Sequence, residues 1–133
     1  MNWKKALTMA LGVTLFASLV AGCGNGNTGS NGGKQKVGVI QLVEHPSLDA
    51  ANKGFVQALA DNGYKDGDTV IIDQQNAQAD QSNLNSISQR FVSDKEDLVL
   101  AIATPAAQTM ANNSKDIPIL GTAITDYVSA KLV

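Results

Sequence analysis

The stretch Leu98–Ala107, LVLAIATPAA, decides the fold of this 133-residue chain. Its first part, Leu98 to Ala103, is an apolar run with the length and composition of a strand that is buried on both faces. Thr104 and Pro105 follow as a hydroxyl N-cap and a proline at the first helical position. A buried strand that leads directly into a helix predicts a β-α unit.

The same alternation extends to both sides of this stretch. Further strands are predicted at residues 37–43 (VGVIQLV), 69–73 (TVIID) and 117–121 (IPILG). A helix of apolar period three to four runs from Ser47 to a left-handed stop at Asn62-Gly63, and a second helix begins at Asp80, its N-cap. We also expect Asp126 to cap a further helix. The order β-α-β-α-β-α-β predicts an α/β fold, a parallel sheet with flanking helices and right-handed crossovers.

The beginning of the chain has the pattern of a bacterial lipoprotein signal peptide over residues 1–22. Two lysines precede an apolar segment from Ala6 to about Val20, and the single cysteine, Cys23, follows Val20-Ala21-Gly22. The segment is too short to span a bilayer comfortably. We therefore expect lipidation at Cys23, which attaches the protein to the extracytoplasmic face of the cell membrane. An ordinary secretory signal, or one anchor helix with a chance cysteine, is the alternative, and both place the remainder outside the cytoplasm.

The remainder divides into a tether and one small domain. Residues 23–36 hold the lipidated cysteine and a Gly/Asn/Ser-rich flexible segment, and residues 37–133 hold the predicted α/β domain. Without residues 1–22 the chain carries 8 basic and 12 acidic residues, which disfavours nucleic acid as a partner. With Cys23 lipidated no disulfide is expected, and the sequence contains neither a phosphate-binding glycine loop nor a histidine-rich metal site, so we predict no cofactor and no metal.

Polar and small residues collect in the loops that follow the predicted strands. In parallel sheets, ligands bind beyond the carboxyl ends of the strands, where loops lead into helix N-termini. The relevant loops are residues 44–47, 104–107 and 122–126. Hydroxyl groups and helix ends at these positions suit a small solute.

Taken together, the lipoprotein signal and the motifs EHPSLDAANKGF, QNAQAD, LAIATPAAQ and IPILGTAITD resemble the substrate-binding lipoproteins of ABC transporters, in particular the tryptophan-binding type. The resemblance covers essentially residues 37–133. It implies the first lobe of a two-lobe, periplasmic-binding-protein-like (type I) fold, here incomplete, because members of that family are about twice this length or longer. It also implies a role without bond chemistry, namely capture of a small hydrophobic or aromatic amino acid, such as tryptophan, for delivery to ABC permease subunits. On this resemblance the chain is a fragment or a truncated product.

The resemblance also points to ligand-binding positions, which lie in the three loops. They are Ser47, Leu48, Thr104, Pro105, Ala106, Thr122 and Ala123. Weaker candidates are Gln75 and Asn76, which end the second predicted strand, and Asp126, which could meet a ligand ammonium group. Ser47 and Thr104 have a simpler alternative role as helix N-caps.

Two other functions remain open from the sequence. One is an exported α/β hydrolase with Ser47 or Thr104 as nucleophile, although His45 is the single histidine and no G-x-S-x-G turn is present. The other is a sugar or nucleobase receptor of the same architecture. Such receptors usually stack rings on aromatic side chains, and Tyr127 is the one aromatic residue that we expect near the loops.

Overall fold

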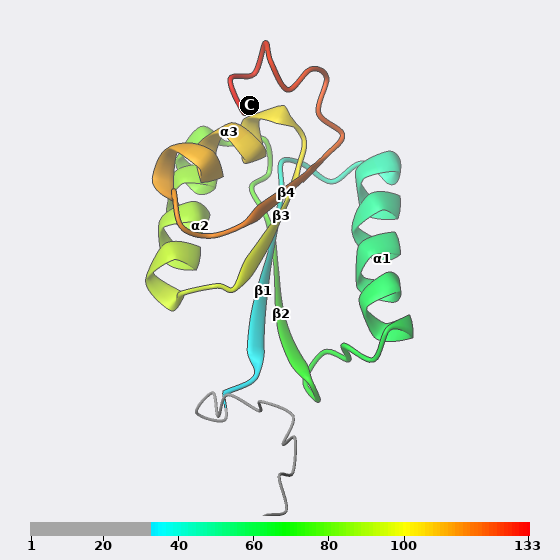
Figure 1. Ribbon diagram of the computed structural model, residues 1–133. Coiled ribbons are helices and arrows are strands. Elements are labelled where there is room, and N and C mark those ends of the chain that lie inside the picture. Colours follow the sequence, from blue (N-terminus) through cyan, green and yellow to red (C-terminus); the bar gives the residue numbers. More distant parts are fainter. Residues whose placement is uncertain (1–32) are drawn as a thin grey trace, which may run out of the picture. The chain divides into compact units, whose positions relative to one another are not determined.

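The computed structural model describes residues 33–133, in which four strands alternate with three helices (Figure 1). The strands are β1 (Gln35–Gln41), β2 (Val70–Asn76), β3 (Leu98–Ile102) and β4 (Ile119–Thr122), and the helices are α1 (Pro46–Asp61), α2 (Gln81–Asp94) and α3 (Thr104–Asn113). All neighbouring strands are parallel, in the order β2-β1-β3-β4. The predicted α/β fold with a parallel sheet is confirmed.

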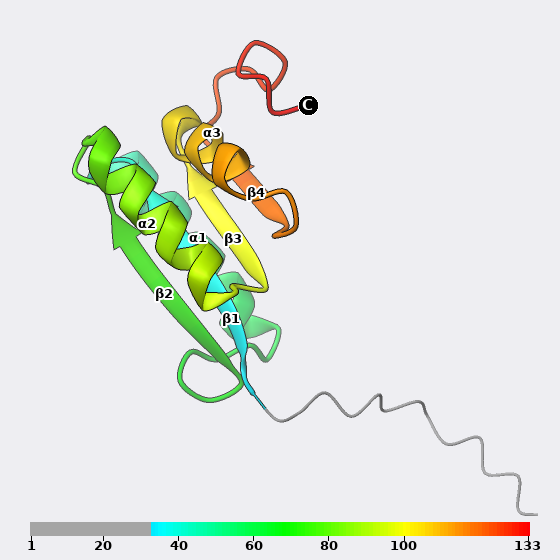
Figure 2. The same ribbon diagram turned by 90° about the vertical axis from the view of Figure 1, so that its left-hand side faces the viewer.

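Helices cover both faces of the sheet. Helix α1 lies on one face, and α2 and α3 lie side by side on the other (Figures 1 and 2). On the α1 face, β1 contributes the buried Val37 and Val39, and on the opposite face it contributes the fully buried Ile40. Successive strand residues point to opposite faces, so the continuous apolar run at the start of the domain supplies two cores. This is why the middle of β1 is apolar without alternation.

Strand β1 and helix α2 approach each other closely at Gly38. Gly38 lies in the middle of β1, and a Cβ atom built on it would lie 2.6 Å from Cε2 of Phe91. Phe91 is fully buried and comes from α2. The ring therefore rests directly on the backbone of β1, and a glycine is required there by space.

Several element bounds differ from the prediction. Gln35 and Lys36, which we assigned to the tether, belong to β1, and β2 continues to Asn76. The helix expected after Asp126 is wrong, because residues 127–131 form turns. The signal segment and Cys23 lie outside the described residues. Within residues 33–133, none of the helices has both the length and the apolar character needed to cross a membrane.

Candidate functional site

The loops after β1, β3 and β4 meet at one end of the sheet, the end reached by the carboxyl termini of the parallel strands (Figure 1). Two backbone hydrogen bonds join them. The N–H of Leu42 donates to the carbonyl of Ile102 over 3.2 Å, and the N–H of Ala103 donates to the carbonyl of Thr122 over 3.0 Å. We call this end, formed by residues 42–48, 103–107 and 122–126, the loop rim. It is where the fold class predicts a ligand.

Thr104 connects two of these loops. The prediction that it caps its own helix is wrong: the N-cap of α3 is Ala103, and that cap has no side-chain hydrogen bond. The Thr104 hydroxyl oxygen instead accepts a hydrogen bond from the N–H of Thr125 over 3.3 Å. The hydroxyl therefore holds the loop after β4 against the start of α3. Pro105 lies in the first turn of α3, at the second helical position and thus one position later than predicted.

Two alanines of the loop rim adopt backbone conformations that alanine rarely takes. Ala103 has φ 84° and ψ 152°, in a region populated almost entirely by glycine. Ala123 has φ 55°, in the left-handed region. Such a conformation costs about 1–3 kcal/mol and is found most often at ligand-binding positions. The sequence contains no signal for it, because alanine does not indicate positive φ.

The start of α3 presents main-chain donors at this point. The first N–H groups of a helix have no partner within the helix, and Pro105 has no N–H. Ala107 donates to the carbonyl of Ala103 over 3.2 Å. This leaves the N–H of the partly exposed Thr104 as a donor suited to a carboxylate, aided by the helix dipole. Ala106 is fully buried as a whole residue, so it supports the start of α3 and offers no exposed group to a ligand.

Thr122 and Ala123 lie beside the start of α3. Thr122 is the last residue of β4, is paired in register with Ile102, and is half-buried, while Ala123 is exposed. The structure thus brings together Thr104, Ala106, Thr122 and Ala123. Pro105 also lines a hollow of about 320 Å³ along α3, together with residues of the C-terminal turns such as Ala130 and Leu132.

The loop after β1 leads into α1 through a histidine cap. We expected Ser47 to be the N-cap, and this is wrong: the cap is His45, whose Nδ1 accepts a hydrogen bond from the N–H of Ser47 over 3.3 Å. Pro46 precedes Ser47 in the first turn, and this shifts the cap upstream. Ser47 is exposed, and Leu48 is partly buried against the core on the α1 face. His45 therefore contacts the backbone of Ser47 through Nδ1, which is a capping arrangement.

Gln75 and Asn76 lie elsewhere. They end β2, which β1 and β3 separate from β4, a distance of about 14 Å at the usual strand spacing. The Gln75 amide donates to Asp73, and the Asn76 side chain accepts from the N–H of Gln78 over 2.8 Å. With Gln41 and Asp49 they line a separate polar hollow of about 150 Å³. As expected, Gln75 and Asn76 lie at the same end of the sheet as the other candidates. They do not lie next to the start of α3.

Asp126 acts as a turn cap. Its Oδ1 accepts a hydrogen bond from the N–H of Ser129 over 2.6 Å. This bond lowers the pKa of Asp126 below its usual value and favours the charged carboxylate. The residue is exposed, so the charge faces solvent next to the loop rim.

Comparison with known proteins gives the family. Over 140 residues the chain is 52% identical to the tyrosine-binding protein of Clostridioides difficile (strain R20291), covering 98% of this chain and 40% of that protein. It is 31% identical over 106 residues to the fructose import binding protein FruE of Bifidobacterium longum (strain NCC 2705), covering 77% of this chain and 31% of that protein.

A solved structure agrees with these matches. The crystal structure of the ABC domain in complex with L-Trp from Streptococcus pneumonia superposes with a TM-score of 0.72 and 48% identity, covering 76% of this chain and 34% of that one. The chain thus spans less than half the length of the proteins it matches. The family model for ABC transporter substrate binding proteins matches residues 36–133, and the chain belongs to that family.

Proposed function

We propose that the loop rim binds the α-carboxylate of an aromatic amino acid. The observation that carries this proposal is the meeting of the loops after β3 and β4 at the N-terminus of α3, where Thr104 accepts from Thr125 and the N–H of Ala103 donates to Thr122. A carboxylate placed there meets the main-chain N–H of Thr104 and the hydroxyl of Thr122. Hydrogen bonds to a charged group contribute about 1.5–3 kcal/mol each.

The choice of an aromatic amino acid rests on the relatives. One is a tyrosine-binding protein and another was solved with L-Trp, and both exceed 45% identity to this chain. The strained Ala103 agrees with this position, because strained backbone conformations cluster at ligand-binding sites. Asp126, kept charged by the Ser129 N–H, is placed to attract the ligand ammonium group.

We further propose the setting of this binding step. Cys23, preceded by Val20-Ala21-Gly22, is the lipid attachment site, and the domain is held at the extracytoplasmic face of the cell membrane. The ligand is delivered to ABC permease subunits without being chemically changed. Family membership and the sequence of residues 1–23 support this setting.

A sugar is the second candidate ligand, and a specific observation favours it. The match to a fructose import binding protein covers 77% of this chain. Sugars are usually held by stacking on aromatic rings. Tyr127 directly follows the last residue of the loop rim, and its hydroxyl donates to the carbonyl of Gly121 over 2.7 Å, which holds it within the fold.

Isothermal titration calorimetry of the 133-residue chain with L-tyrosine, L-tryptophan and D-fructose tests the proposal. Binding of either amino acid, weakened about tenfold to hundredfold by Thr104→Ala and retained in Thr104→Ser, is the expected result. Ser86→Ala is the matched control, because it also removes one hydroxyl, on the exposed side of α2. Binding of fructose alone would replace the proposed ligand class with a sugar. Absence of binding by all three ligands would refute the loop rim as a site in this chain.

A further inference from the structure

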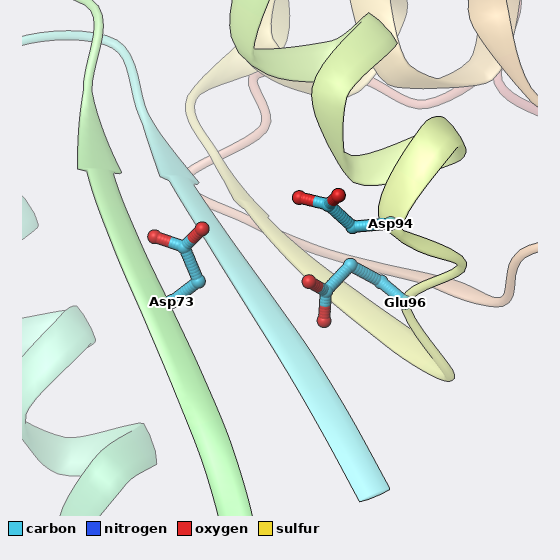
Figure 3. Close-up of side chains that lie close together, drawn as sticks. All are labelled: Asp73, Asp94 and Glu96. Atoms are coloured by element: carbon cyan, nitrogen blue, oxygen red, sulfur yellow. The ribbon is translucent and has the colours of Figure 1, made fainter.

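Three carboxylates from separate parts of the chain come together at the side of the sheet covered by α2. Asp73 extends from β2, Asp94 ends α2, and Glu96 lies in the loop before β3 (Figure 3). One carboxylate oxygen of each lies within 4.8 Å of the others. Figure 3 shows the carboxyl groups of Asp94 and Glu96 directed toward the strand that carries Asp73. We call these three residues the acidic cluster.

Glu96 is the unusual member. Its exposed fraction is 7%, and among the described residues its Oε2 is buried without a hydrogen-bond partner. Buried polar groups are nearly always hydrogen-bonded, and a buried charge is costly unless it is paired. Burial first, and then the negative charge of Asp73, raise the pKa of Glu96 to about 7. A buried carboxyl group beside two other carboxylates is stabilised either by its own proton or by a positive partner.

None of the cations among the described residues near Glu96 bonds to its carboxyl group. Asp94 and Asp97 add negative charge, and Lys36 opposes them from β1. Lys36 uses its ammonium group on the carbonyl of Asp94 over 2.9 Å. Arg90 pairs with Asp73 over 2.7 Å, and its side chain is 45% exposed, so it can move away into solvent. Each of these cations contacts another member of the cluster, and the Glu96 oxygen stays without a donor.

We propose that Asp73, Asp94 and Glu96 bind one hard divalent cation, Ca²⁺ in the first instance. Carboxylate oxygens are the preferred ligands of such ions, and Ca²⁺ accepts about six to eight oxygens in flexible geometry, which three carboxylates and water can supply. Cysteine and histidine are absent from the cluster, and this disfavours softer metals. Oxygens up to 4.8 Å apart are close enough to surround one ion.

The ion would lie away from the loop rim and join distant segments. Glu96 lies two residues before the amino end of β3, whereas the loop rim is at the carboxyl ends. The ion would connect β2 with the end of α2 and the loop before β3. We therefore expect Ca²⁺ to raise the melting temperature and to leave amino-acid binding at the loop rim unaltered. The proposed Ca²⁺ site does not depend on the proposed amino-acid function, so a chain that binds no amino acid is still expected to bind Ca²⁺ here.

Calorimetric titration of the 133-residue chain with CaCl₂, after treatment with EDTA and desalting, tests the site. The expected result is one Ca²⁺ per chain, with affinity at least tenfold lower in Glu96→Gln and in Asp73→Asn. Asp68→Asn is the matched control, because it removes the same charge from an exposed turn and is expected to bind like the unsubstituted chain. Circular dichroism establishes that each variant is folded.

Arg90→Gln gives a test in the opposite direction. Removal of the cation that competes for Asp73 is expected to tighten Ca²⁺ binding several-fold, and this result does not depend on a destabilised variant. Carbon-13 NMR of the Glu96 carboxyl group is expected to show a shift on addition of Ca²⁺. Absence of Ca²⁺ binding at millimolar concentration, equal binding by Glu96→Gln and Asp68→Asn, or a Glu96 carboxyl signal unchanged by Ca²⁺ would each overturn the proposal.

Discussion

Substitution of Gly38 by alanine is expected to destabilise the domain strongly. A Cβ atom at this position would lie 2.6 Å from Cε2 and 2.7 Å from Cδ2 of Phe91, well inside contact distance. The Phe91 ring is fully buried, and Leu84 and Ser88 of the same helix are also buried, so the ring has little space into which to move. Either the ring leaves its preferred rotamer or α2 moves away from β1. Overpacking of this kind costs about 1–3 kcal/mol.

Urea unfolding followed by circular dichroism measures this cost. For a domain of this size, 1 kcal/mol lowers the melting temperature by about 4–8 °C, so Gly38→Ala is expected to melt roughly 4–24 °C lower. Gly54→Ala is the matched control. Gly54 lies in α1 with no atom within 4 Å of its Cβ position, and alanine there is expected to stabilise by up to about 1 kcal/mol.

A double substitution locates the cost at the ring. Replacement of Phe91 by leucine removes the atoms that clash but leaves a cavity, and Gly38→Ala is then expected to destabilise much less than in the unsubstituted chain. The coupling between the two sites is expected to be about 1 kcal/mol or more. Equal stability of Gly38→Ala and Gly54→Ala, or no coupling with Phe91→Leu, would refute the reasoning that the ring requires a glycine beneath it.

Two further predictions concern strain and charge. Ala103→Gly is expected to raise the free energy of unfolding by about 1 kcal/mol in urea titrations, because relief of strain at φ 84° exceeds the extra entropy of glycine; a loss of stability would contradict this. In EDTA, the unsubstituted chain is expected to lose stability relative to Glu96→Gln as pH rises. The pKa of Glu96 is raised from 4.5 to about 7 in the fold, so its protonated form stabilises the fold fully below pH 4.5 and this stabilisation is lost through pH 7, by at most about 3 kcal/mol. Parallel pH profiles of the two proteins would show that the Glu96 carboxyl group is not the source.

The alternation of strands and helices could be predicted because the central strands β1 and β3 contain continuous apolar runs. Val37, Val39 and Ile40 show this directly, since they are buried on opposite faces of one strand. Positions on the loop rim could be predicted for the same reason, because parallel strands place their following loops at one end.

The roles of the side chains at these positions could not be predicted as well from the sequence. Ser47 and Thr104 are of residue types that often act as N-caps, but His45 and Ala103 occupy the N-cap positions. Which residue becomes the N-cap depends on the hydrogen bonds that the neighbouring loop offers. The acidic cluster could not be predicted from the sequence either. Asp73 and Glu96 are far apart in sequence, and they meet because β1 pairs Gly38 with Asp73 in register and α2 returns the chain to the same place.

Helix α1 has a consequence for the motions of the domain. Every residue of α1 is at least partly exposed, whereas α2 and α3 each contribute fully buried side chains. Segments with few buried contacts open locally at a free-energy cost below that of global unfolding. Amide protons of α1 should therefore exchange with solvent deuterium sooner than those of α2. Ser47, in the first turn of α1, should fluctuate with that helix while the junction of β3 and β4 stays ordered. A ligand at the loop rim would then contact one rigid segment, at the junction of β3 and β4, and one flexible segment, at the start of α1.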